Sequence, residues 1–166
     1  MATRRKSTGK PPLAGTGIDT GHLEELTGYL LRRATSRVMA DFVQVAANHD
    51  LRPVPFSILL LVESNPGVRQ GQVAEALAIK PANMVPLVNM LVERGLLRRR
   101  VGVEDRRSFE LALTAAGRNV LQQCHAGIAA HEQRLFSVLS ATERARLHDM
   151  LRRVIQSADN GDQQDL

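Results

Sequence analysis

The sequence has very few aromatic side chains and a single cysteine. Its 166 residues include no Trp, one Tyr and four Phe, so few rings are available for stacking on the bases of single-stranded nucleic acid. One cysteine cannot form an internal disulfide, so the fold does not depend on an oxidising compartment. No apolar run is long enough to span a membrane, and the basic N-terminus lacks the apolar stretch of a signal peptide. These absences predict a cytoplasmic protein with no membrane partner.

Motifs of enzymes and metal sites are also missing. The sequence contains no G-x-S-x-G, no P-loop and no H-E-x-x-H. His125 and His131 stand six positions apart, on different faces of a helix, and no further ligands occur at metal-binding spacing. Cys124 has no second cysteine, so an inert buried thiol is the favoured interpretation over a redox sensor. We therefore expect no catalysis, no cofactor and no bound metal.

Positive charge is what the chain has in excess. It carries 22 Lys and Arg against 17 Asp and Glu, and because Lys occurs only three times, 19 of the 22 cations are Arg. A guanidinium group matches phosphate oxygens and guanine edges better than an ammonium group does. The charge favours a nucleic acid partner, although anionic lipid or an acidic protein would also be attracted.

The arginines are concentrated in one short segment, residues 96–117. Two runs of strand-like composition flank a loop there, so the segment is expected to form a β-hairpin. The charged residues of this hairpin are five cations, Arg98, Arg99, Arg100, Arg106 and Arg107, and three anions, Glu104, Asp105 and Glu110. This excess of positive charge favours binding to a polyanion. The alternative is that the charges form a solvated surface with no partner.

Apolar residues at helical spacing surround the hairpin. Before it, helices are expected over residues 22–48, 56–64, 71–77 and 81–94. After it, Thr114 is the expected N-cap of a helix that runs to about residue 138, and a capping-box pattern at residues 140–143 opens a last helix. Two helices joined by a tight turn and followed by a basic hairpin form a winged helix-turn-helix. The predicted fold is mainly α with a small β-wing.

Residues 22–157 resemble the MarR family of bacterial transcriptional regulators. The wing motif D-x-R occurs as Asp105 and Arg107, and the motif L-x-L-T-x-x-G follows as Leu111, Leu113, Thr114 and Gly117. The resemblance implies a homodimer that binds palindromic double-stranded DNA and responds to a ligand, usually as a repressor. It also implies that the first helix and the last two helices interlock two protomers. A bundle within one chain is the alternative, because apolar stripes do not report whose surface they cover.

The predicted organisation has five segments. Residues 1–20 form a disordered basic arm, and residues 21–52 form the first dimerisation helix. Residues 53–113 form the winged helix-turn-helix that binds DNA. Residues 114–158 form the C-terminal dimerisation helices, and residues 159–166 form a flexible tail.

The second helix of the helix-turn-helix is the expected reader of the DNA major groove. Its apolar residues at core-facing spacing are Met84, Leu87, Val88 and Leu91. The residues assigned to DNA on this helix are Ala82, Asn83, Val85, Pro86 and Asn89. Asparagine pairs best with adenine and small apolar groups contact thymine methyls, so the readout is expected to favour A·T pairs.

Three positions of this helix depart from the usual pattern of the family. Many members have Arg in place of Pro86, Thr in place of Val85 and a Ser N-cap in place of Lys80. Proline lacks a backbone N–H and clashes with the preceding turn, so the helix is expected to kink or to begin irregularly at Pro86. An alternative is that this helix serves stability while the wing and the shape of the DNA supply specificity.

The wing residues receive different roles. Arg107 is expected to enter the minor groove with Asp105 orienting it, the role that the resemblance implies for this pair. The residues expected to meet phosphates are Arg98, Arg99, Arg100 and Arg106.

The resemblance also implies a small ligand, often an aromatic acid or related metabolite. It would bind the crevice between the dimerisation helices and the winged domain, where the candidate lining residues are Tyr29, Arg32, Arg33 and Phe56. The alternative function is a low-specificity architectural winged-helix protein that binds DNA and senses no ligand.

Overall fold

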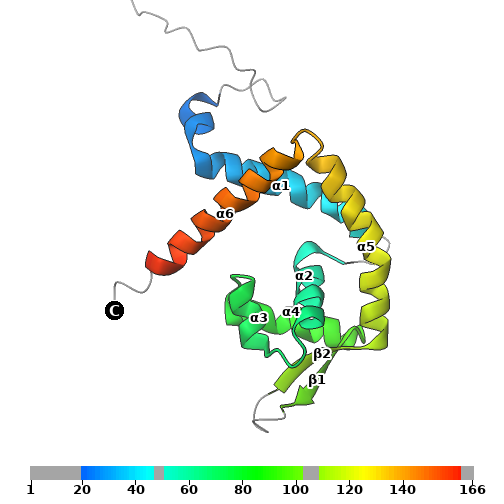
Figure 1. Cartoon of the computed structure of the whole chain (residues 1–166). Helices are drawn as coiled ribbons and strands as arrows, with labels where there is room; N and C mark the ends of the chain where they lie inside the picture. Colours follow the sequence, from blue (N-terminus) through cyan, green and yellow to red (C-terminus); the bar gives the residue numbers. More distant parts are fainter. Residues whose placement is uncertain (1–19, 47–50, 103–108, 162–166) are drawn as a thin grey trace, which may run out of the picture. The chain divides into compact units, whose positions relative to one another are not determined.

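The computed structural model describes residues 20–46, 51–102 and 109–161, which fall into two compact units, residues 1–40 and 41–166 (Figure 1). The described part of the first unit contains the 3-10 helix η1 (Gly21–Glu25) and most of α1 (Thr27–Ala46). Leu26 is extended between them, so the prediction of one helix from residue 22 is wrong at its start. Thr27 and Gly28 have low helix propensity, which favours a break there. Most of the predicted arm and the end of the tail lie outside the described residues.

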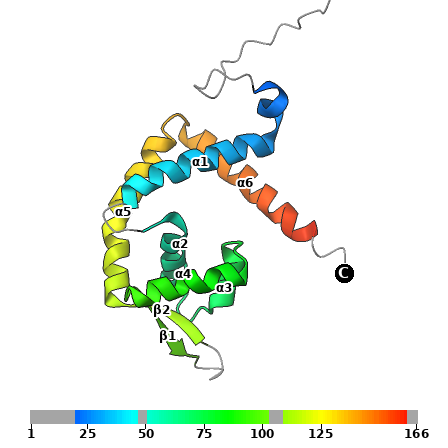
Figure 2. The same ribbon diagram turned by 180° about the vertical axis from the view of Figure 1, so that it is seen from behind.

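The second unit contains the winged helix-turn-helix. Its elements are α2 (Pro53–Ser64), α3 (Gln70–Ala76), α4 (Pro81–Glu93), β1 (Leu97–Val101), β2 (Phe109–Leu113), α5 (Ala115–Leu135) and α6 (Ala141–Gly161). The strands form one antiparallel hairpin, and Figure 2 shows α2, α3 and α4 gathered beside it. The predicted fold class is confirmed. Helix α2 begins three residues before the predicted start because proline is well tolerated in a first helical turn, where its missing N–H costs nothing.

The hydrophobic core of this unit is built largely from α2, α4, the hairpin and α5. Ile58 and Leu59 of α2 are fully buried beside Met84, Val88 and Leu91 of α4. The predicted inward face of α4 is therefore confirmed, with Leu87 half-buried at its edge. Fully burying one such side chain stabilises the folded state by about 1.5–3 kcal/mol, so α4 is held firmly with its opposite face toward solvent.

The L-x-L-T-x-x-G motif forms the junction between the hairpin and α5. Leu111 and Leu113 lie in the core. The hydroxyl of Thr114 accepts a hydrogen bond from the N–H of Gly117 (3.0 Å) and donates one to the carbonyl of Gly95 (2.6 Å). Gly95 has φ of +68° and ends α4, as a glycine after a helix C-terminus commonly does. The motif therefore fixes the start of α5, and Thr114 is the predicted N-cap.

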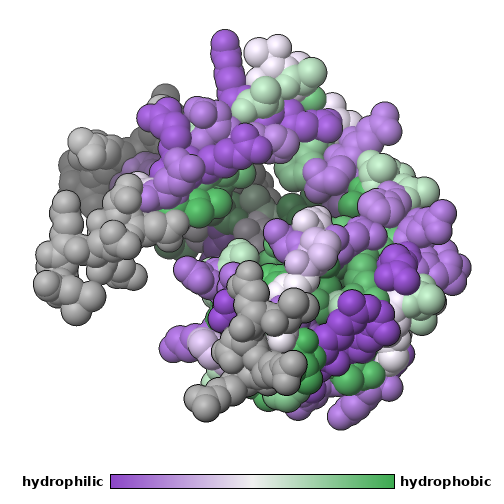
Figure 3. All heavy atoms as spheres, turned by 60° about the horizontal axis from the view of Figure 1, so that its bottom comes forward, coloured by the Kyte–Doolittle hydropathy of each residue, from purple (hydrophilic) through white to green (hydrophobic). Residues whose placement is uncertain are grey.

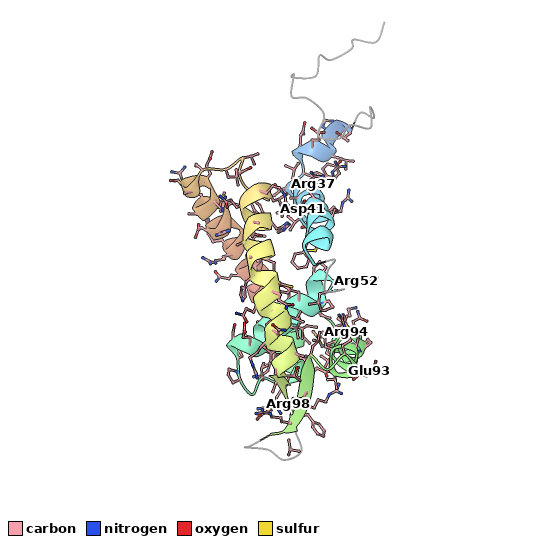
Figure 4. The ribbon with its side chains drawn as sticks, turned by 90° about the vertical axis from the view of Figure 1, so that its right-hand side faces the viewer. Arg37, Asp41, Arg52, Glu93, Arg94 and Arg98 are labelled. Atoms are coloured by element: carbon pink, nitrogen blue, oxygen red, sulfur yellow. The ribbon has the colours of Figure 1, made fainter. Side chains whose placement is uncertain are left out.

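The far end of α5 carries a polar cluster. His131 is 2% exposed, and its Nδ1–H donates to Asp41 Oδ2 (2.7 Å), which also accepts from Arg134 (2.6 Å). Figure 4 labels Asp41 on α1 beside α5. Asp41 therefore satisfies the buried ring nitrogen of His131. Helix α5 ends at Leu135, and Val138 is 84% exposed, so the prediction that the helix continues to residue 138 is wrong.

Helix α6 opens with the predicted capping box. Ser140 N–H donates to Glu143 Oε2 (2.8 Å), and Glu143 N–H donates to Ser140 Oγ (3.3 Å). Within the described ranges, none of the helices combines the length and hydrophobicity needed to cross a membrane.

Candidate nucleic-acid interface

Helices α3 and α4 form the helix-turn-helix. The side chain of Gln72 caps α3 by accepting the backbone N–H of Arg69 (2.9 Å). In the turn, Ala78 adopts a left-handed backbone (φ 51°), and the carbonyl of Lys80 accepts the N–H groups of Asn83 (2.9 Å) and Met84 (3.2 Å). These bonds fix where α4 begins and therefore which of its residues face outward.

The outward face of α4 carries the predicted DNA residues. Ala82, Asn83, Val85 and Pro86 are exposed, whereas Asn89 is half-buried. The helix begins at Pro81 and continues past Pro86, so an irregular start at Pro86 is wrong, whereas a kink there stays a prediction. The physical reason is that Pro81 provides the first turn, while Lys80 is an N-cap without a side-chain hydrogen bond. Contact of these residues with DNA stays a prediction.

The pairing of β1 with β2 gives the wing two different faces. Cross-strand partners share a face, and Leu97 pairs with Leu113, both buried, while Arg99 pairs with Leu111. Arg99 therefore belongs to the core side of the hairpin. Arg98, opposite Ala112, and Arg100, opposite Glu110, belong to the other face. The three arginines of β1, all predicted to meet phosphates, are thus not equivalent.

Arg99 is hydrogen-bonded to helix α4. Its Nη2 donates to Oδ1 of Asn89 on α4 at 2.6 Å. The sequence predicts a phosphate contact for Arg99 and a base contact for Asn89, and it does not predict this bond because composition does not reveal the register of the hairpin. The only signal is the alternation of β1, which separates Arg99 from its two neighbours.

An exposed apolar pair lies further out on the same face of the wing. Val101 and Phe109 are cross-strand partners, and they are 57% and 59% exposed. Neither residue was predicted to belong to the interface. Figure 3 looks onto the end that carries the wing, where green apolar surface lies among purple hydrophilic side chains. Asp105, Arg106 and Arg107 at the wing tip lie outside the described residues.

The predicted ligand residues fall in both units. In the first, the guanidinium carbon of Arg32 lies 5.3 Å from the centre of the Tyr29 ring, and Arg33 is half-buried. In the second, Phe56 lies in the hydrophobic core with its ring 5.6 Å from that of Phe42. Surface hollows occur along α6 and beside the wing, and neither is lined by these four candidates. Their role in ligand binding stays a prediction.

Two of the shifted pKa values among the described residues bear on the chemistry open to this chain, those of Cys124 and Asp41. Burial raises the pKa of the Cys124 thiol, which disfavours the thiolate needed for redox or metal chemistry. Hydrogen bonds from His131 and Arg134 lower the pKa of Asp41 and keep it ionised. Among the described residues, no three His, Cys, Asp or Glu side chains gather in a way that could hold a metal ion.

Known proteins share this arrangement over nearly their whole length. The transcriptional repressor CouR, solved with a 23-mer DNA duplex, is 40% identical to this chain with a TM-score of 0.78, covering 83% of this chain and 98% of CouR. CouR bound to p-coumaroyl-CoA is 38% identical with a TM-score of 0.77, covering 83% and 97%. A profile of the MarR family matches residues 49–108. The chain belongs to the MarR family.

Two further DNA-binding proteins match the chain at lower identity. The repressor NicR of Pseudomonas putida is 27% identical over 158 residues, which cover 95% of this chain and 98% of NicR. BpsR of Bordetella bronchiseptica, whose DNA binding is regulated by 6-hydroxynicotinic acid, is 28% identical with a TM-score of 0.75, covering 82% and 97%. Membership in the MarR family confirms the prediction of a DNA-binding transcriptional regulator, and the family consists of regulators rather than enzymes.

Proposed function

We propose that this MarR-family regulator is a homodimeric repressor that leaves a palindromic operator when it binds an aromatic acid or the coenzyme A thioester of one. The observation that carries the proposal is the 40% identity to CouR, a repressor solved both with DNA and with p-coumaroyl-CoA. The exposed face of α4 and the arginine-rich wing supply the chemistry that duplex DNA requires.

The DNA interface combines a major-groove and a minor-groove contact. Helix α4 lies in the major groove with Asn83 toward base edges, while Ala82, Val85 and Pro86 contact thymine methyls. Arg98 and Arg100 meet phosphates from the outer face of the wing. Arg107, with Asp105 beside it and Arg106 near phosphate, reads a narrow minor groove at the tip.

A second copy of the chain covers the apolar side chains that one chain leaves exposed. Leu23, Leu26 and Leu30 are exposed in the first unit, and Met150, Val154 and Ile155 are exposed on α6. Such apolar stripes on the terminal helices favour a two-fold partner. Val154→Glu should therefore convert a dimer to a monomer at micromolar concentration in sedimentation. A wild-type chain that sediments as a monomer, both free and on DNA, would contradict this part of the proposal.

The effector binds through an aromatic ring and a negative charge. Tyr29 offers a ring, and Arg32 with Arg33 offers cations suited to a carboxylate or to the phosphates of coenzyme A. The ligands of CouR and BpsR, p-coumaroyl-CoA and 6-hydroxynicotinic acid, share the aromatic ring and the acid-derived group.

Fluorescence anisotropy tests the proposal in two steps. At one fixed salt concentration, affinity for a duplex chosen by binding-site selection is compared with affinity for a scrambled duplex, and a ratio of at least about 10³ is expected. The complex is then titrated with p-coumaroyl-CoA, p-coumarate, 6-hydroxynicotinate and coenzyme A, and an aromatic compound but not coenzyme A alone should release the duplex. A ratio near one would support the architectural alternative, and release by none of the four would contradict the proposed effector class.

A further inference from the structure

We propose that Arg99 and Asn89 form a tie that sets the position of the wing relative to the recognition helix, so that both are positioning residues rather than readers of DNA. The inference rests on the proposed function, because it concerns how α4 and the wing engage one duplex. It replaces the roles predicted from the sequence for these two residues, a base contact for Asn89 and a phosphate contact for Arg99.

The tie is a short bond between two different elements. The guanidinium of Arg99 donates to the amide oxygen of Asn89 at 2.6 Å, and the two residues lie on β1 and α4. A bond with a charged donor is about twice as strong as one between neutral groups. The bond lies at the surface, with Asn89 half-buried and Arg99 exposed, so its short distance and its charged donor carry the argument.

The bond lies where the wing needs support. Leu97 and Leu113, at the base of the hairpin, are buried, whereas on β1 beyond Leu97 the side chains are exposed. Backbone contacts hold β2 at this level, because the N–H of Leu111 donates to the carbonyl of Val68 (2.8 Å) and Glu110 forms a bridge with Arg69; β1 is the strand that Arg99 joins to α4. Arg99 stands on the core side just beyond the buried base, so its bond to α4 limits how far the outer wing can swing. Figure 4 labels Arg98 on the wing and Glu93 with Arg94 at the end of α4, the two elements that the tie joins.

The same bond argues against Asn89 as an adenine reader. A bidentate contact with adenine requires the asparagine Oδ1 to accept from the adenine amino group while Nδ2 donates to N7. In this chain Oδ1 already accepts from Arg99, and a guanidinium beside it disfavours the approach of a second donor. Asn83, which is exposed in the first turn of α4, therefore stays the better candidate for base contact.

The variant Asn89→Asp best distinguishes a residue that positions the wing from a residue that reads a base. An aspartate keeps the acceptor and turns the tie into an ion pair, so operator affinity should stay within about threefold of wild type and the selected consensus should not change. A base-reading Asn89 would instead lose its donor and place a negative charge in the groove, which should cost at least about tenfold and alter the consensus. That second result would overturn the proposal.

Arg99→Ala and Arg98→Ala form a matched pair, because each removes one guanidinium from β1 but from opposite faces. Arg99→Ala should weaken operator binding about tenfold. In the minor groove, the wing should no longer protect the DNA from cleavage by hydroxyl radicals. In the major groove, α4 should still protect guanine N7. The melting temperature of this variant should match that of wild type. Arg98→Ala should keep the wing protection and lower the slope of log affinity against log salt by about one for each phosphate that the arginine neutralises.

Two further results decide whether Arg99 and Asn89 act together as a tie. The double variant Asn89→Ala/Arg99→Ala should bind no more weakly than Arg99→Ala alone, because a single tie can be broken only once. If Arg99→Ala only lowers the salt slope and keeps the wing protection, Arg99 is a phosphate contact and the tie is refuted. Failure of the wild type to prefer its operator would refute the proposed function instead, and the two failures are therefore distinguishable.

Discussion

Replacing Gly117 with alanine tests how tightly the hairpin is joined to α5. Gly117 lies in the first turn of α5, and a Cβ placed there would overlap the carbonyl oxygen of Leu96 and come within 3.0 Å of a methyl group of Leu113. The carbonyl of Leu96 belongs to the backbone and already accepts the N–H of Thr114 at 3.1 Å. It cannot move aside without disturbing the junction that fixes both α5 and the wing.

The expected cost follows from three contributions. Overpacking a well-packed site by one methyl typically costs about 1–3 kcal/mol, and straining the Thr114–Leu96 hydrogen bond costs about 1 kcal/mol. The higher helix propensity of alanine offsets this loss by about 1 kcal/mol. The net effect of Gly117→Ala is therefore a loss of about 1–3 kcal/mol in the free energy of unfolding.

Urea unfolding followed by circular dichroism measures this loss. The matched control is Gly71→Ala in α3, where an added Cβ meets nothing within 4 Å, so stability should stay equal or rise by up to about 1 kcal/mol. Each kcal/mol should also appear as a shift of about 2–4 °C in the melting temperature. Equal stability of the two variants would refute the close approach of α5 to Leu96.

Other predictions address the interface and the polar cluster. Pro86→Arg should tighten operator binding and alter one base preference in binding-site selection; an unchanged affinity and consensus would contradict contact at this position. Arg107→Ala should cost about 1–3 kcal/mol per dimer in operator titrations, whereas binding within about twofold of wild type would contradict its role. The pKa of Asp41 is lower in the folded protein than in the unfolded chain. The ionised carboxylate therefore stabilises the fold above the pKa of the unfolded state, and this stabilisation is lost as the pH falls through the pKa of the folded state. Asp41→Asn should therefore flatten the acid side of a stability profile from urea unfolding, and an unchanged profile would contradict this.

Local patterns in the sequence are sufficient to predict most of the fold. The apolar spacing of α4, the glycine after it and the Thr114 cap each depend on neighbours within a few residues. The first residue of a helix is harder to predict where a proline can either break a helix or begin one. Residues 53–55 contain two prolines that indicate a break, although they form the first turn of α2.

The contacts between distant residues cannot be predicted in the same way. The bond from Arg99 to Asn89 depends on the register of β1 against β2, and the partner of His131 lies 90 positions away. A count of arginines predicts an anion-binding wing but not that one arginine is directed to α4. Side-chain partners that meet only after packing leave no periodic trace in the chain.

A footprint of the wild-type protein on its selected operator tests the central claim most directly. If α4 of each protomer lies in the major groove with the wings in the flanking minor grooves, guanine N7 protection should occur in two patches about 10 base pairs apart. Hydroxyl-radical protection should appear in the minor grooves outside both patches, related by the same two-fold symmetry. Uniform protection along the duplex, or a single unpaired patch, would contradict a symmetric dimer that reads DNA through α4 and the wing.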